Sequence, residues 1–170
     1  MSDEPSLTIP AARVVELATA RRLATCVDEV RLKGFAFCNA MLARGYPVAV
    51  TQALRTDADQ AKLYAMGRTS PSWDAGWPGR PKLGTPVTKA ATAWDSPHGC
   101  GAAFDFAFLV DGVLVADDPK RKGELHSWDD RHPWHLAGDV ADTVGLDWGG
   151  RFDDKPHLQA LKWRRFRRAA

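Results

Sequence analysis

Two histidines and one aspartate, spread over two segments, are the first candidates for chemistry. His98 and Asp105 lie seven residues apart in the segment SPHGCGAAFD, and His157 lies in DDKPHLQ. Asp105 stands in the apolar run AFDFAF, where an unpaired buried carboxylate is costly and needs a cation or several hydrogen-bond donors. Two histidines and a carboxylate, with a fourth position open, form the ligand set of a catalytic zinc ion. These residues predict a His2Asp zinc site; the alternative is a hydrogen-bonded pair of His98 and Asp105 that fastens a loop to a strand.

An acidic residue outside this ligand set is a candidate general base for a zinc-activated water. Asp154 lies three residues before His157, across a bend directed by Pro156. It can therefore face the same cavity without binding the same ion. Asp153 is its immediate rival, and the spacing alone does not separate the two. The alternative for Asp154 is a turn-capping aspartate.

Other polar residues have weaker signals. Arg55 follows the β-prone run YPVAVTQ and precedes a predicted helix. An arginine at a strand end is a candidate for carbonyl or carboxylate recognition, and the alternative is a solvated surface arginine. The segment ELHSWDDRHPWHL contains three further histidines, for which we expect surface or packing positions because histidine is commonly half-buried without binding a ligand: His126, His132 and His135.

The elements that position these residues follow from the hydrophobic pattern and its breaks. We expect two helices between about residue 10 and Gly45, separated near 19–22 or 33–34. Further helices are predicted from Thr56 or Asp57 to Met66 and from Pro133 to about Val144. The predicted strands are 46–51, 103–110 (with a hairpin to 113–115) and 156–161, while 68–95 is expected to be a long surface loop and 147–150 a turn. This order is typical of an α+β fold with an antiparallel sheet.

Length and composition limit the classes of protein. The chain has 170 residues, of which 45% are hydrophobic and 26% charged, so we expect one globular domain over 1–170 and exclude a wholly disordered chain. No apolar run is long enough to span a membrane. The acidic N-terminus lacks the features of a secretion signal, and three scattered cysteines are typical of a protein made in a cytoplasm.

The charge is unevenly distributed. Lys and Arg total 23 against 21 acidic residues, but five of the basic residues lie in the last ten positions. The body is therefore mildly acidic, which argues against a general nucleic-acid binder. The basic segment 161–170 contains KWRRFRR, which is compatible with contact to an anionic membrane. The alternative is that Trp163 and Phe166 dock on the body.

Three separated segments then agree with one family. They are TQALRT with the following DQ and LYAMGRT, the SxHxxGxAxD segment that begins at Ser96, and GLDWGG followed by DKPH. Together they span about 46–160. The sequence resembles the zinc peptidases of the D-alanyl-D-alanine carboxypeptidase and VanY type, and most closely the phage L-alanyl-D-glutamate peptidases, which are endolysins.

This resemblance implies roles for particular residues and a fold similar to that of the Hedgehog and DD-peptidase proteins, with the zinc site on the sheet. It implies zinc bound by His98, Asp105 and His157, Asp154 as the general base, and Arg55 as the residue that steadies the carbonyl oxygen. For substrate binding we predict three residues of the matching segments: Ser96, Gln60 and Trp148.

The implied function is hydrolysis of the peptidoglycan stem peptide, at the L-Ala–D-Glu bond, by an endolysin. A D-Ala-D-Ala carboxypeptidase or dipeptidase is the nearest alternative, and a catalytically silent, zinc-containing wall-binding module is an alternative of another class. We expect a monomer that stays in the host cytoplasm until a holin releases it to the cell wall.

Overall fold

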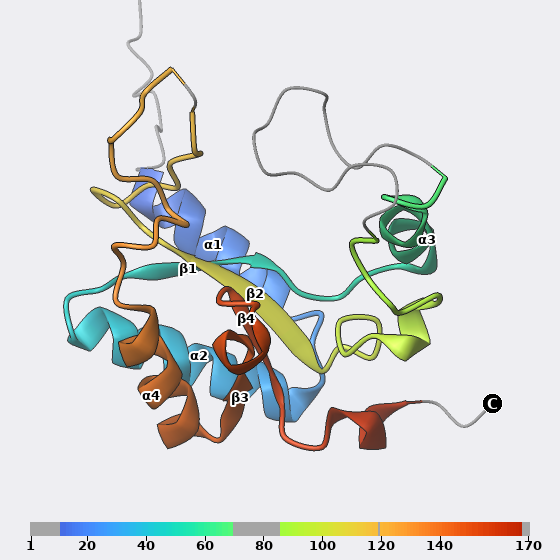
Figure 1. The fold of residues 1–170 in the computed structure, drawn as a ribbon. Helices are drawn as coiled ribbons and strands as arrows, with labels where there is room; N and C mark the ends of the chain where they lie inside the picture. The colour runs from blue at the N-terminus through green and yellow to red at the C-terminus, as the bar shows by residue number, and fades with distance from the viewer. Residues whose placement is uncertain (1–10, 70–85, 119, 168–170) are drawn as a thin grey trace, which may run out of the picture.

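The computed structural model describes residues 11–69, 86–118 and 120–167, which form helices packed on an antiparallel sheet (Figure 1). The sheet has four strands in the order β1-β2-β4-β3. Their bounds are Val48–Gln52 for β1, Ala103–Phe108 for β2, Leu146–Trp148 for β3 and His157–Ala160 for β4. The helices are α1 (Ala11–Leu23), α2 (Asp28–Ala43), α3 (Asp57–Ala65) and α4 (Trp134–Val144). Short 3-10 turns cover Ala93–Asp95, Gly149–Phe152 and Trp163–Phe166. The predicted α+β class with a small antiparallel sheet is confirmed.

Strand β2 separates the core from the site because successive side chains of a strand point to opposite faces. Phe104, Phe106 and Phe108 are fully buried on one face, where the ring of Phe106 lies 5.0 Å from that of Phe37 in α2. Asp105 alternates with these residues and therefore leaves the other face of the same strand. The apolar alternation thus places a carboxylate opposite the hydrophobic core.

The first two helices are present, but the predicted position of their break is wrong. The chain leaves α1 after Leu23 and enters α2 at Asp28. Gly34 lies inside α2, where an added Cβ would lie 2.5 Å from Cδ2 of Leu23. This glycine therefore allows a close approach between the two helices. The low helix propensity of glycine instead suggests that a helix ends there. The actual break is held by the Val27 amide, which donates to the carbonyl of Gly101 at 2.9 Å.

Helices α3 and α4 have the predicted limits. The hydroxyl of Thr56 accepts the Asp59 amide at 3.1 Å and caps α3. Pro133 precedes α4, and Gly145 ends it in a left-handed conformation with φ 77°. In Figure 1, α3 lies apart from the helices that pack on the sheet, and it contacts the 3-10 turn at 93–95. These ends follow from local backbone rules, so the sequence predicts them well.

Two predicted elements differ from the structure. The predicted turn at 147–150 is wrong because Trp148 belongs to β3, pairs with Leu158 of β4 and is 7% exposed. The predicted hairpin after β2 is reduced to one bridge between Val110 and Val113, although Asp111 has φ 51° and the following glycine φ 80°, as a tight turn requires. Part of the expected loop at 68–95 lies outside the described residues.

Residues 163–166 of the C-terminal segment are docked on the body. Trp163 and Phe166 are partly buried and pack against the hydrophobic core. Arg165 forms an ion pair with Glu29 of α2. The structure therefore has the packing that was the alternative to membrane contact; membrane contact itself stays a prediction. Within the described residues, no helix is both long and apolar enough to cross a bilayer.

Candidate metal centre

His98, Asp105 and His157 converge at one point of the molecule. Asp105 of β2 and His157 of β4 are Cα partners in the antiparallel register, so their side chains leave the sheet side by side. Asp105 Oδ1 lies 3.1 Å from His157 Nδ1 and 3.2 Å from His98 Nε2, and the two nitrogens are 3.1 Å apart. Among the residues that the structure describes, this is the group of three side chains arranged to hold a metal ion.

The loop that carries His98 is shaped by a close backbone approach. A Cβ added at Gly99 would lie 1.9 Å from the carbonyl oxygen of Ala93, so a side chain at this position is excluded without a backbone shift. Gly101 has φ 65°, a conformation that suits glycine, and the chain then enters β2. His98 Nδ1 lies 2.7 Å from the carbonyl oxygen of Ala53. These constraints place the imidazole beside Asp105 and His157.

The bonding of His98 shows that the cluster suits a cation. A backbone carbonyl only accepts hydrogen bonds, so Nδ1 carries the proton and a neutral ring keeps its lone pair on Nε2. That lone pair faces the Asp105 carboxylate at 3.2 Å. Two ligand atoms of a tetrahedral zinc site are about 3.3–3.5 Å apart when the bonds are about 2.0–2.1 Å. The spacing and the donor types of the cluster therefore fit a shared zinc ion.

The charge state of Asp105 also suits a metal ligand. Burial alone would raise the pKa of this carboxyl group. When the rings of His157 and His98 carry a second proton, their hydrogen bonds and positive charge outweigh burial and hold the pKa of Asp105 well below its ordinary value. Burial of the His157 ring disfavours its charged form, but the hydrogen bond and charge of Asp105, the charge of Asp154 and the contact with Gln159 outweigh burial and raise the pKa of His157. A carboxylate that remains ionised at neutral pH is ready to bind a cation.

Asp154 faces the same hollow without belonging to the three-residue cluster. Its backbone amide donates to the carbonyl of Gly149 at 2.9 Å, and its carbonyl accepts the His157 amide at 3.1 Å. Desolvation of its carboxyl group, and then the nearby charge of Asp105, raise the pKa of Asp154 above its usual value, while the positive groups around it act in the opposite direction. Asp153 and Asp154 are both exposed, but of the two only Asp154 lines the hollow. The structure thus places Asp154, rather than its neighbour, beside the cluster.

Arg55 lies at the edge of the hollow, held by two glutamines. Its Nη2 donates to Gln52 Oε1 at 2.6 Å and its Nη1 to Gln60 Oε1 at 3.1 Å. Burial lowers the pKa of Arg55, and the charge of Asp105 is the largest of the opposing influences. Among the described residues, Arg55 Nε is a buried nitrogen without a hydrogen-bond partner. Neutral amides hold the guanidinium, so its charge is not cancelled by a directly bonded carboxylate.

The hollow has a volume of about 520 Å³, within the usual range of small-ligand pockets. Ser96 lines it, and its role in substrate binding stays a prediction. Gln60 is fully buried behind Arg55, and its Nε2 donates to the Ala90 carbonyl at 2.6 Å. Trp148 is also buried and donates from Nε1 to the Lys155 carbonyl at 2.8 Å. The structure therefore brings Ser96 into the hollow, whereas Gln60 and Trp148 are buried and do not line it.

Two lining glutamines are absent from the sequence predictions. Gln52 ends β1 and is the Cα partner of Asp105, whereas Gln159 lies two residues after His157 on β4. The two-residue period of a strand could have identified Gln159, because residues i and i+2 share a face. Nothing in the sequence near Gln52 indicates its contact with Arg55. The hollow is also lined by the apolar side chains of Leu63, Val87 and Phe152.

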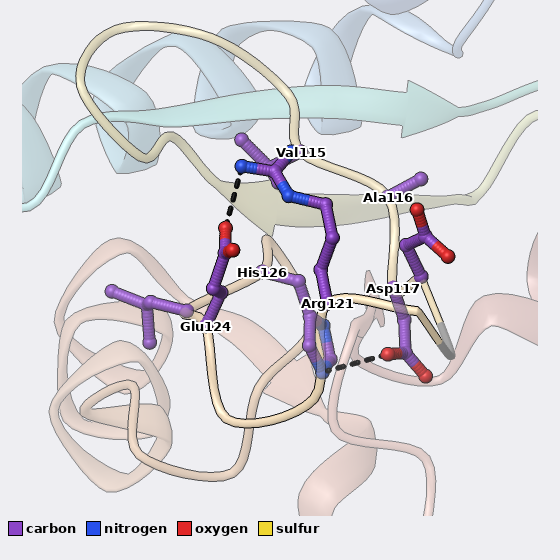
Figure 2. A pocket seen from close by; sticks show the side chains of 8 residues that line it. Val115, Ala116, Asp117, Arg121, Glu124 and His126 are labelled. Atoms are coloured by element: carbon purple, nitrogen blue, oxygen red, sulfur yellow. Dashed lines mark ion pairs between the residues drawn. The ribbon is translucent and has the colours of Figure 1, made fainter.

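The other three histidines lie outside the cluster, as predicted. His132 stacks on Phe108 with ring centres 4.5 Å apart, and His135 meets Trp148 edge to face at 5.7 Å. Figure 2 shows the pocket beside His126, which has a volume of about 10 Å³. There His126 Nε2 lies 3.8 Å from Asp117 Oδ1, and Arg121 pairs with Glu124. Three carboxylates and one guanidinium line this pocket, those of Asp117, Asp118, Glu124 and Arg121.

Comparison with known proteins gives an independent result. The chain is 31% identical over 121 residues to the peptidoglycan L-alanyl-D-glutamate endopeptidase CwlK of Bacillus subtilis. This match covers 69% of the chain but 63% of that protein, so the chain spans less than two thirds of the length of its curated relative. A crystal structure of the Serratia marcescens L-Ala D-Glu endopeptidase ChiX aligns with a TM-score of 0.48 and 18% identity, over 85% of this chain and 86% of that one.

A family model described as D-alanyl-D-alanine carboxypeptidase matches residues 89–160. The matched segment contains the three residues of the cluster and Asp154, whereas Arg55 lies before it. The resemblance to the D-alanyl-D-alanine carboxypeptidase family that the sequence motifs predict is therefore confirmed, and residues 89–160 carry it.

Proposed function

We propose that this protein is a zinc-dependent peptidase that cleaves the peptidoglycan stem peptide at the L-Ala–D-Glu bond. The observation that carries the proposal is the meeting of His98, Asp105 and His157 within 3.2 Å of one another. They lie in a hollow that Arg55 and Asp154 also line. The similarity to CwlK, a peptidoglycan L-alanyl-D-glutamate endopeptidase, supports the choice of substrate and bond.

In this proposal His98 Nε2, Asp105 Oδ1 and His157 Nδ1 hold the zinc ion. The chemistry that zinc supplies when bound is Lewis acidity, which polarises a carbonyl group and lowers the pKa of water. The protein supplies two neutral imidazoles and one carboxylate, so the three ligands carry a single negative charge. The three side chains come from a loop and two paired strands, which keeps their spacing rigid.

Asp154 moves the proton. Its carboxylate accepts a proton from the attacking water and returns it to the leaving amine nitrogen. Desolvation raises the pKa of Asp154, which brings it nearer to neutral pH and improves its match to both tasks. General acid–base catalysis of this kind typically contributes about 10²–10⁴-fold to the rate.

Arg55 stabilises negative charge on the carbonyl oxygen of the scissile bond. Gln52 and Gln60 hold two of its nitrogens, so the guanidinium needs little reorganisation when the substrate arrives. Preorganised donors of this kind are worth about 10²–10³-fold in turnover.

Digestion of purified peptidoglycan tests the proposal. Mass spectrometry of the products should show new N-terminal D-Glu and new C-terminal L-Ala, and a chelator should abolish the reaction until zinc is restored. Release of a terminal D-Ala instead would favour the second candidate, a D-Ala-D-Ala carboxypeptidase, which the matching family description supports. Binding of zinc and wall without any product would identify a silent wall-binding module.

The proposed biological role is lysis of a bacterial cell from a phage or prophage gene. In this role the enzyme is made in the host cytoplasm and reaches the wall when a holin opens the membrane. Peptidoglycan is then the partner, with no role for nucleic acid, and the enzyme acts as a monomer. Expression with and without a holin, followed by the optical density of the culture, tests this role.

A further inference from the structure

Gln159 connects the candidate metal centre to a carboxylate outside it. Gln159 Oε1 lies 3.1 Å from His157 Nε2, and Gln159 Nε2 donates to Asp147 Oδ2 at 3.2 Å. His157 and Gln159 share one face of β4 because they are two residues apart. Asp147 is the Cα partner of Gln159 in the pairing of β3 with β4. The backbone of the sheet therefore holds all three side chains in a row.

These two contacts define the direction of each hydrogen bond. An ionised carboxylate only accepts, so the Gln159 amide must turn its NH2 group toward Asp147 and its oxygen toward His157. That oxygen also only accepts, so His157 Nε2 carries the ring proton. In the neutral imidazole the lone pair then lies on Nδ1, the atom that is 3.1 Å from Asp105 Oδ1.

We infer that Gln159 is a positioning residue which, with Asp147, selects the His157 tautomer whose Nδ1 binds the metal ion. The inference rests on the metal site of the proposed function. The backbone carbonyl of Ala53 selects the tautomer of His98 in the same way, and no side-chain substitution removes that carbonyl. His157 depends on a side chain, so its case can be tested directly. Metal-bound histidines generally donate their second N–H to such an acceptor, and losing it costs about 10–100-fold in metal affinity.

Arg151 holds the carboxylate of Asp147, the residue farthest from the metal centre in the row His157, Gln159 and Asp147. Arg151 Nη1 donates to Asp147 Oδ1 at 3.2 Å, and its Nη2 contacts Asp142 Oδ2 at 2.6 Å. Asp147 therefore uses one oxygen for Arg151 and the other for Gln159. The arginine fixes the orientation of the carboxylate toward the amide, which preserves the order of donors and acceptors up to His157.

Zinc affinity of a matched pair of variants tests the inference. Gln159→Met keeps the side-chain length but removes the acceptor, so its zinc dissociation constant should rise about 10–100-fold. Leu161→Met changes an exposed side chain just after the end of β4, outside the hollow, and should keep the wild-type affinity. Competition with a chromogenic chelator measures both, and circular dichroism checks that each variant is folded. Wild-type affinity in Gln159→Met would overturn the inference.

A rescue experiment separates tautomer selection from a general packing role. The double variant Asp147→Asn with Gln159→Glu keeps an acceptor for His157 and a donor–acceptor pair between the two outer positions. It should bind zinc about as well as the wild type, because His157 Nε2 still has an acceptor. If Gln159→Met and the double variant were equally weak, the loss would come from local packing, and tautomer selection would be wrong.

The wild-type chain offers a test that needs no variant. Nitrogen-15 NMR of the zinc-loaded protein should show His157 protonated at Nε2 and metal-bound at Nδ1, and the opposite tautomer would overturn the inference. Failure of the wild-type chain to bind zinc at all would contradict the proposed function. Equal zinc affinity of the wild type and Gln159→Met would contradict this inference alone.

Discussion

Asp105 and His157 lie directly opposite each other on β2 and β4, and 3.1 Å separates Asp105 Oδ1 from His157 Nδ1. The backbone hydrogen bonds of the sheet thus set the distance between two of the three proposed ligands. His98 joins them from a loop whose path depends on Gly99. Strand pairing therefore fixes Asp105 and His157, and the tightly packed loop at Gly99 fixes His98.

Asp154 and His157 should have separable roles. Asp154→Asn should retain zinc and lose about 10²–10⁴-fold in turnover, because it removes the proton carrier and leaves the three ligands. His157→Ala should lose zinc as well as turnover. Zinc content by atomic absorption and hydrolysis of peptidoglycan measure the two effects. Asp153→Asn is the control, since that side chain does not line the hollow. Near wild-type turnover in Asp154→Asn would refute the general-base role.

Arg55 should matter for turnover more than for zinc. Arg55→Lys keeps a positive charge, but a single ammonium group cannot reproduce the fixed fork that contacts Gln52 and Gln60. We expect turnover to fall about 10²–10³-fold, with zinc content unchanged. Arg44→Lys, at an exposed residue after α2, is the matched control. Equal turnover in the wild type and Arg55→Lys would show that the guanidinium does not contact the reacting carbonyl.

Gly99→Ala should displace the loop that carries His98. The new Cβ would lie 1.9 Å from the Ala93 carbonyl oxygen, so the loop carrying His98 must shift. We expect weaker zinc binding together with a lower melting temperature. Gly123→Ala is the control: nothing lies within 4 Å of its Cβ, and its φ of 86° should cost about 1–2 kcal/mol without any effect on zinc. Unchanged zinc affinity in Gly99→Ala would mean that His98 is not held by this approach.

The raised pKa of Asp154 predicts the acidic side of the pH profile. A general base works in its ionised form, so activity should fall as the pH drops through the pKa of Asp154. Desolvation places this pKa above the ordinary value of 3.8, and the loss should therefore begin at a higher pH than for a solvated aspartate. The dependence of kcat/KM on pH measures it, with zinc content followed in parallel. The acidic limb should vanish from the residual activity of Asp154→Asn; an identical limb would assign it to another group.

The docked C-terminal segment should contribute to stability. Phe166→Ala removes a partly buried ring from the edge of the core and should lower the free energy of unfolding by about 1–2 kcal/mol. Arg164→Ala, which removes an exposed side chain beside Trp163, should change it by less than about 0.5 kcal/mol. Urea unfolding measures both. An unchanged unfolding midpoint in Phe166→Ala would show that the docking adds no stability. Binding of the wild type to anionic vesicles tests the separate prediction of membrane contact.

The helix ends and the strand alternation could be predicted from the sequence, because they depend on residues that are close together in the chain. Pro133 and Gly145 bound α4 because a proline suits a helix start and a glycine accepts the left-handed conformation at its end. The alternation in AFDFAF predicts both β2 and the unusual position of Asp105. The pattern of two histidines and one aspartate likewise indicates a metal site from the sequence alone, because a carboxylate in an apolar strand needs a cation or several hydrogen-bond donors.

Tertiary structure decided what depends on partners distant in the chain. Trp148 lies in a strand rather than a turn because it pairs with Leu158, and Gly34 stays inside a helix because Leu23 packs against it. Gln60 lies behind Arg55 rather than in the hollow because its amide bonds to the guanidinium and to Ala90. Residue types and spacing determine which groups are available for chemistry. The directions of the hydrogen bonds between these groups depend on strand pairing. The pairing of Asp147 with Gln159, for example, turns the amide oxygen of Gln159 toward His157.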